Sequence, residues 1–108
     1  AITGTNGKTT TTSLVGEIMS KFAKSSFTVG NIGIPYTDIA DKTDEDSVTV
    51  LETSSFQLET IIDFRPNISA ILNITPDHLN RHHTMENYIK VKEDISKNQT
   101  EDDFCILN

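Results

Sequence analysis

The chain begins with Ala1-Ile2-Thr3-Gly4-Thr5-Asn6-Gly7-Lys8-Thr9-Thr10-Thr11-Thr12, and this stretch decides the fold. A short apolar segment leads into two glycines three positions apart, and a lysine and a threonine follow directly. Glycines let the backbone turn tightly and point successive N–H groups into a concave anion site. A helix that starts at the second glycine adds unpaired N–H groups and the positive end of its dipole. The stretch therefore predicts a loop that holds the phosphates of a nucleotide triphosphate, formed by Gly4, Thr5, Asn6, Gly7, Lys8, Thr9 and Thr10.

Lys8 and Thr9 are the residues expected to carry the chemistry of this loop. Lys8 can reach the outer phosphates as a point charge, and the Thr9 hydroxyl can hold Mg²⁺. The general motif places a glycine five residues before Gly7, where this chain has Ile2, so the loop is a shortened variant. The alternative interpretation is a glycine-rich turn that only caps a helix.

Length and composition limit the classes of protein to consider. At 108 residues the chain forms at most one domain, and its net charge of −7 disfavours nucleic acid and anionic membranes as partners. Cys105 is the only cysteine, which excludes an internal disulfide and is typical of a reducing compartment such as the cytoplasm. The sequence contains no apolar run long enough to span a membrane and no signal peptide. Because both ends fall within expected strands, we expect a piece of a larger enzyme.

Hydrophobic patterning predicts strands that alternate with helices. The expected strands are 27–29, 48–51, 68–73 and 104–108, in addition to the apolar start of the chain. The expected helices are 8–24, 35–41, a segment from Ser54 or Ser55 through Ile62, and 84–98. In the first helix, one apolar face is expected to be buried, formed by Leu14, Val15, Ile18, Met19 and Phe22. The alternation predicts a three-layer α/β/α fold with a mostly parallel sheet.

The ends of the strands are where a ligand is expected, because ligands of parallel sheets gather beyond the carboxyl ends of the strands. The junctions 4–9, 30–35, 52–57 and 73–78 all carry groups suited to phosphate, metal or polar substrate. Glu52 follows a buried strand and is expected to share Mg²⁺ with Thr9. Its alternative role is that of a negative charge at the start of the next helix.

Two later segments contain ionisable residues in unusual places. The run Asp77-His78-Leu79-Asn80-Arg81-His82-His83 leaves open whether His78 contacts a ligand or is structural, and His82 and His83 are expected to face solvent. In the last helix, Lys92 falls in the middle of an apolar stripe formed by Met85, Tyr88, Ile89 and Ile95. A lysine there must be paired, neutralised or modified, or its amine must extend to the rim.

Several of these segments together resemble the Mur ligases, the amide-forming enzymes of peptidoglycan precursor synthesis. Gly4-Thr5-Asn6-Gly7-Lys8-Thr9 is similar to the short ATP loop of the family. The segments 30–33, 73–78 and especially Glu52-Thr53-Ser54-Ser55-Phe56-Gln57-Leu58-Glu59 resemble its D-glutamate-adding branch. The chain departs from the family pattern at Asn80, where aspartate is usual, and at Thr53, where leucine is common.

The resemblance implies a ligase of three domains with a P-loop NTPase-like centre. An N-terminal domain would bind the UDP moiety, a central domain would bind ATP, and a C-terminal domain would complete the glutamate site. Residues 1–108 are expected to be most of the central domain, and therefore inactive alone. The last strand is expected to leave an exposed sheet edge through which the piece self-associates. The implied substrates are UDP-N-acetylmuramoyl-L-alanine and D-glutamate, which ATP would join through an acyl phosphate.

The same resemblance implies roles for individual residues. Thr9 and Glu52 would hold the first of two Mg²⁺ ions, and His78 and an N-carbamylated Lys92 the second. Residues expected around the substrate are Asn31, Ser54, Gln57 and His78. Two alternatives remain open: another ligase of the superfamily, such as a folate polyglutamate synthetase, and a nucleotide-binding regulatory module that ligates nothing.

Overall fold

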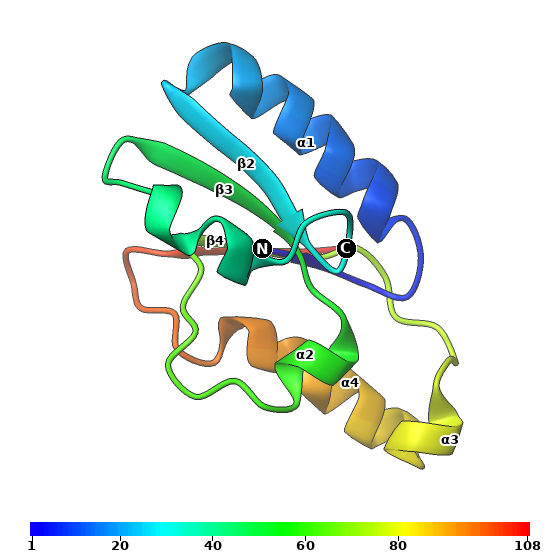
Figure 1. Ribbon diagram of the computed structural model, residues 1–108. Helices are drawn as coiled ribbons and strands as arrows, with labels where there is room; N and C mark the ends of the chain where they lie inside the picture. Colours follow the sequence, from blue (N-terminus) through cyan, green and yellow to red (C-terminus); the bar gives the residue numbers. More distant parts are fainter.

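A single parallel sheet forms the centre of the molecule in the computed structural model, which describes residues 1–108 (Figure 1). The strands are β1 (Ile2–Thr3), β2 (Ser25–Gly30), β3 (Ser47–Glu52), β4 (Ile68–Ile71) and β5 (Phe104–Leu107). Their order is β2-β3-β1-β4-β5, and every neighbouring pair is parallel. The predicted parallel sheet is confirmed, with strand bounds close to those expected.

Helices cover both faces of this sheet, as the three-layer prediction requires. They are α1 (Lys8–Phe22), α2 (Ser55–Leu58), α3 (Leu79–His82) and α4 (Met85–Glu93). Short 3₁₀ turns lie at Tyr36–Asp38 (η1), Ala40–Lys42 (η2) and Asp94–Ser96 (η3). Figure 1 shows α1 on one side of the sheet and α2 and α4 on the other. None of these helices has the length and apolarity needed to cross a membrane.

The face of α1 that packs on the sheet differs from the predicted one. Thr12 and Gly16 are buried, and a Cβ atom on Gly16 would lie 2.0 Å from the Thr28 hydroxyl. Such a close approach of helix to strand admits only small residues at the contact. Of the five residues predicted for the buried face, Val15 and Met19 are half-buried, whereas Leu14, Ile18 and Phe22 turn outward with exposed fractions of 60%, 46% and 81%.

On the opposite face, α2 and η3 pack against β4. Leu58, Ile71 and Ile95 form the buried cluster between them. The predicted stripe of the last helix is confirmed, because Tyr88, Lys92 and Ile95 are all buried. Three helices differ from expectation. α2 is one turn long instead of reaching Ile62, and the 3₁₀ turns η1 and η2 take the place of the expected helix 35–41. The α-helical part of the last helix ends at Glu93, followed by η3.

The order of the strands determines where a ligand can bind. β1 lies in the middle of the sheet, between β3 and β4. The chain leaves β1 through α1 toward β2 at one edge, whereas it leaves β4 through α3 and α4 toward β5 at the other. A crevice forms beyond the carboxyl ends of strands where connections diverge in this way. The predicted junction residues all lie on this side of the sheet.

Candidate active site

The loop between β1 and α1 has the conformation of an anion-binding loop. Gly7 is the N-cap of α1 with φ 80°, and no side chain caps the first turn of the helix. The N–H groups of that turn lack intrahelical acceptors and are free to bind an anion. Gly4 has φ 155°, and a Cβ there would lie 3.1 Å from the Leu72 Cβ and 3.3 Å from the Asn73 carbonyl oxygen. Both glycines are therefore required by the backbone.

Asn73, at the end of β4, fixes this loop from the neighbouring strand. Its Oδ1 accepts a hydrogen bond from the Asn6 N–H (2.8 Å), and its Nδ2 donates to the Asn6 carbonyl (2.9 Å). The Thr5 hydroxyl accepts from the Thr75 N–H (3.0 Å) and lies 3.1 Å from the Tyr88 hydroxyl. These bonds hold the loop in shape without a ligand. The sequence signal for Asn73 is its place directly after a strand, but its contact with the loop was not predicted.

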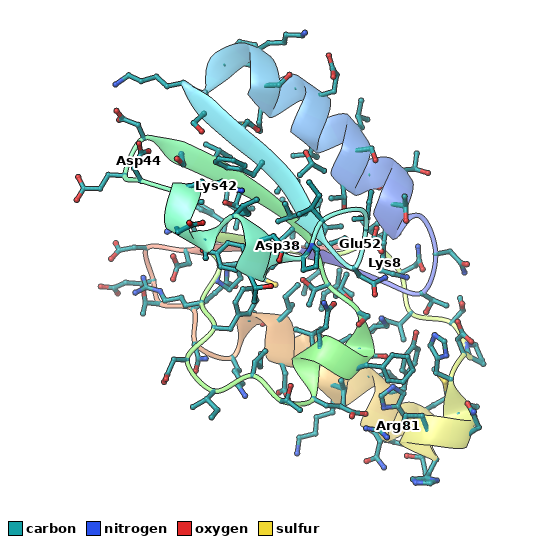
Figure 2. All side chains as sticks on the ribbon, in the orientation of Figure 1. Lys8, Asp38, Lys42, Asp44, Glu52 and Arg81 are labelled. Atoms are coloured by element: carbon teal, nitrogen blue, oxygen red, sulfur yellow. The ribbon has the colours of Figure 1, made fainter.

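A carboxylate, a hydroxyl and an amide meet where the predicted Mg²⁺ site was expected. The Thr9 hydroxyl donates to Glu52 Oε2 (2.8 Å), and Asn31 Nδ2 donates to Glu52 Oε1 (2.9 Å). Glu52 is only 2% exposed. Figure 2 shows Glu52 and Lys8 close together at the start of α1. Three separate segments of the chain thus bring their polar groups to one point.

The ligand types at this point suit one kind of metal ion. A carboxylate and a hydroxyl are hard oxygen ligands of the kind that Mg²⁺ takes from a protein, together with water and phosphate oxygens. Nowhere in the structure do three or more His, Cys, Asp or Glu side chains come together in a way that could hold a metal ion. The donor set fits Mg²⁺ shared with a nucleotide better than a metal held by protein ligands alone.

Two lysine side chains converge on one backbone carbonyl of the loop. Lys8 Nζ donates to the Gly4 carbonyl (3.0 Å) and the Thr5 carbonyl (2.9 Å). Lys92 Nζ donates to the same Gly4 oxygen (2.9 Å) and weakly to the Thr3 hydroxyl (3.4 Å). Lys92 is 2% exposed and its Nζ lies 4.8 Å from the centre of the Tyr88 ring, so its amine does not extend to the rim.

The buried position of Lys92 changes its acid–base behaviour. Burial lowers the pKa of the Lys92 amine to about 8, and the positive charge of Lys8 contributes to the lowering. Neither amine forms an ion pair with a carboxylate. The loop therefore carries two cations whose charges are not neutralised by the protein.

A cleft of about 230 Å³ opens beside these groups. Five of the predicted site residues line it, together with Ser55, Phe56 and Tyr88: Lys8, Asn31, Ser54, His78 and Lys92. Gln57 is not among the lining residues. Its Oε1 instead accepts hydrogen bonds from the N–H (2.9 Å) and hydroxyl (3.1 Å) of Ser54, which caps α2.

The three histidines that follow β4 differ from one another. His78 is exposed at the edge of the cleft, with a left-handed backbone (φ 52°) at the start of α3 and its ring 5.1 Å from that of Phe56. His83 is exposed, as predicted. The prediction for His82 was wrong, because the unpredicted turn α3 directs its ring inward, where it is 4% exposed. It packs between the rings of Phe56 and Tyr88.

A parallel sheet, a glycine loop before a long helix and a buried carboxylate at the end of the neighbouring strand β3 define the class of P-loop nucleotide-binding domains. The model of the Mur ligase middle domain matches residues 2–108, and the chain belongs to this family. The resemblance found in the sequence is confirmed.

The relatives of the chain include ligases from several bacteria. Over its 108 residues it is 71% identical to the UDP-N-acetylmuramoylalanine–D-glutamate ligase of Lachnoclostridium phytofermentans, and 66% identical to that of Lachnospira eligens. It is 64% identical over 107 residues to the ligase of the same name from Clostridioides difficile. These matches cover 99–100% of the chain but 24% of each relative. The chain thus spans about a quarter of the length of the curated relatives it matches.

Proposed function

We propose that this domain is the ATP site of a ligase that joins UDP-N-acetylmuramoyl-L-alanine to D-glutamate through an acyl phosphate. The observation that carries the proposal is the convergence of Lys8, Lys92 and the Thr9–Glu52 pair on one glycine loop. The names of the relatives supply the substrates. In this proposal the domain is the central one of three, it acts in the bacterial cytoplasm, and it is inactive without the other two.

The phosphate loop would hold ATP through groups that the chain orients in advance. The N–H groups from Gly7 to Thr10 would bind the phosphates, with Lys8 at the outer ones, because the N–H groups of Thr5 and Asn6 donate to Asn73. The reaction requires a phosphate and a carboxylate, both anions, to approach each other. In a chain of net charge −7, Lys8 would supply positive charge at the loop where that approach occurs.

Two Mg²⁺ ions would fit the side chains beside the loop. Thr9 and Glu52 would hold one, and His78 and a carbamylated Lys92 the other; when bound, they neutralise charge on the phosphoryl group. Carbon dioxide reacts only with a neutral amine, and a pKa of about 8 leaves roughly a tenth of Lys92 neutral at pH 7. The resulting carbamate is a carboxylate on a long arm, which suits a hard cation.

Asn31, Ser54 and His78 would orient the carbon substrates in the cleft. The bond from Asn31 Nδ2 to Glu52 fixes the amide plane of Asn31, which directs its remaining polar atoms. Gln57 would act through Ser54, because the bonds between these two side chains set the direction of the Ser54 hydroxyl.

The test uses a full-length ligase in which these 108 residues replace the matching segment of the L. phytofermentans relative. We expect phosphate release from ATP to require both UDP-N-acetylmuramoyl-L-alanine and D-glutamate. Phosphate release without either substrate would support a regulatory module instead, and glutamate transfer to a folate would support the alternative ligase.

The carbamate is tested in the same protein with Lys92→Ala. This variant should lose nearly all activity, and added acetate or formate should restore part of it by supplying the missing carboxylate. Lys90→Ala, on the exposed side of α4, is the matched control and should remain active. An active Lys92→Ala variant, or a folded one that no acid rescues, would contradict the carbamate.

A further inference from the structure

Asn73 extends the hydrogen bonds between β1 and β4 into the phosphate loop. The Leu72 N–H donates to the Thr3 carbonyl (2.9 Å), and the Thr5 N–H donates to the Asn73 carbonyl (2.9 Å). Beyond Thr5 the Asn73 side chain takes the place of a peptide group, because its amide carries the same kinds of donor and acceptor. Its Oδ1 accepts from the Asn6 N–H (2.8 Å), and its Nδ2 donates to the Asn6 carbonyl (2.9 Å). One side chain thus binds both polar backbone groups of Asn6.

The Thr5 hydroxyl makes a second connection to the segment that follows β4. It accepts from the Thr75 N–H (3.0 Å) and donates its only proton to the Thr75 carbonyl (3.1 Å). The Tyr88 hydroxyl, 3.1 Å away, must therefore donate to Thr5. Figure 1 shows the chain after β4 passing beside the loop between β1 and α1. We call the bonds of Asn73 and Thr75 to Thr5 and Asn6 the loop brace.

The loop brace determines which groups of the loop remain available to a phosphate. Two N–H groups of the loop are bound to Asn73, so the free ones begin at Gly7, where α1 starts. On its other side, the braced segment continues to His78, which lines the same cleft as Lys8. The loop brace therefore holds the phosphate-binding turn and one wall of the cleft at a fixed separation.

We propose that Asn73 is a positioning residue for phosphoryl transfer to the substrate carboxylate, a role that rests on the function proposed above. In that step a carboxylate oxygen forms a bond to the terminal phosphorus of ATP. The bond from this phosphorus to the bridging oxygen breaks, and ADP leaves with the electron pair. The attacking and leaving oxygens must lie in line with the phosphorus, so the loop that holds ATP and the cleft that holds the acceptor need a fixed separation. Asn73 touches no reacting atom and acts through Asn6.

The structural effect of the loop brace can be separated from this role. The bonds between Asn73 and Asn6 lie at the exposed surface of the loop, so water can replace them without leaving a buried group unpaired. A nucleotide would still bind the free N–H groups at the start of α1 and the amine of Lys8. Replacing Asn73 should therefore loosen the position of the loop while preserving the fold and most of the affinity for nucleotide.

The experiment measures Asn73→Ala in the full-length ligase described above. Calorimetric titration with ADP and Mg²⁺ gives the dissociation constant and the number of functional sites. We expect the single-turnover rate constant of ADP formation, expressed per site, to fall about 100-fold, the cost of displacing the reacting groups by about 1 Å. The dissociation constant of ADP should stay within about threefold of the wild type.

Asn108→Ala is the matched control for this variant. Asn108 also stands directly after a strand, and its Nδ2 donates to the Leu72 carbonyl (2.9 Å), next to Asn73 in the chain. It forms no hydrogen bond with the phosphate loop. Its replacement should leave both the rate constant and the affinity for ADP as in the wild type.

Each outcome decides the proposal. An unchanged rate constant per site for Asn73→Ala would overturn the positioning role. Equal losses of rate and ADP affinity, or a fall only in the number of sites, would also overturn it and would indicate a structural role alone. If Asn73→Ala does not fold, Thr5→Val supplies the comparison, because valine keeps the shape of the side chain and removes every bond of the hydroxyl. The same selective loss of rate is then expected, and its absence would overturn the proposal. A wild type that forms no amide with D-glutamate would overturn the proposed function itself, and the positioning role with it.

Discussion

Replacing Lys92 with methionine should make the 108-residue chain more stable at pH 7. The amine is 2% exposed and forms no ion pair, and its pKa falls from 10.5 to about 8 on folding. Each unit of difference in pKa between the folded and unfolded chain corresponds to about 1.4 kcal/mol. The buried ammonium therefore lowers the free energy of unfolding by roughly 3 kcal/mol at neutral pH.

The substitution also removes contacts that stabilise the folded chain. The Gly4 carbonyl loses one donor but keeps the bond from Lys8 Nζ at 3.0 Å, so it is not left unsatisfied. The Thr3 hydroxyl loses a long bond of 3.4 Å, and the Tyr88 ring loses its cation. Together these losses are worth about 1 kcal/mol. Methionine retains the length and apolar stem of the side chain, so the net gain should be about 2 kcal/mol.

Urea unfolding at several pH values tests this reasoning. Below pH 8 Lys92 is protonated in both the folded and the unfolded chain, so the buried ammonium lowers the free energy of unfolding by the full amount. Between pH 8 and 10.5 the unfolded chain binds more protons than the folded one, so the wild type gains stability and the difference from Lys92→Met narrows. Lys90→Met, at an exposed site on the same helix, should change little. A Lys92→Met chain no more stable than the wild type at pH 7, or a difference that does not vary with pH, would refute the argument.

Three further predictions concern other parts of the molecule. In the full-length ligase, Lys8→Ala should lower kcat by at least about 100-fold, or about 3 kcal/mol, without unfolding the protein, and a kcat within a few-fold of wild type would exclude Lys8 from the reaction. Thr53→Val should raise the stability of the chain by about 1 kcal/mol in urea, because the Thr53 hydroxyl is buried without a hydrogen-bond partner. Thr53→Ser keeps the hydroxyl and should show no such gain. The isolated chain should self-associate through β5, an edge strand whose residues are all exposed, and sedimentation should show Ile106→Lys to be monomeric; a wild type that is monomeric at high concentration would contradict this.

The parts of the site that were predicted correctly depend on topology and on local signals. β-branched runs mark the strands, and the second glycine marks the start of α1 at Lys8. Once the strands are parallel, their carboxyl ends must lie at one edge of the sheet. The contact of Thr9, Glu52 and Asn31 follows from that rule without knowledge of the register. The buried face of α4 was predictable because a helix with one apolar stripe presents that stripe to the sheet.

The errors arise where contacts between distant segments decide the outcome. Periodicity shows which residues of α1 share a face, but the close approach of Gly16 to Thr28 determines which face meets the sheet. For His82, the deciding contacts are those with Ser55 and Glu59, which lie more than twenty residues earlier in the chain. No local pattern indicates such a pairing. The one-turn helices α2 and α3 are likewise too short to leave a periodic signal.

The phosphate loop shows how stability and proposed activity oppose each other in this fold. Lys8 and Lys92 both donate to the Gly4 carbonyl, and the buried one of the pair has no carboxylate to offset its charge. The buried amine lowers the stability of the folded chain, but its lowered pKa favours the neutral form that the proposed carbamate requires. Replacing a residue that is kept for its role in the reaction should raise the stability of the chain and lower the activity of the ligase. Lys92→Met is expected to do both, whereas Thr53→Val, whose hydroxyl serves no contact, should gain stability and leave activity unchanged. The pair of variants therefore distinguishes a buried polar group that serves the reaction from one that does not.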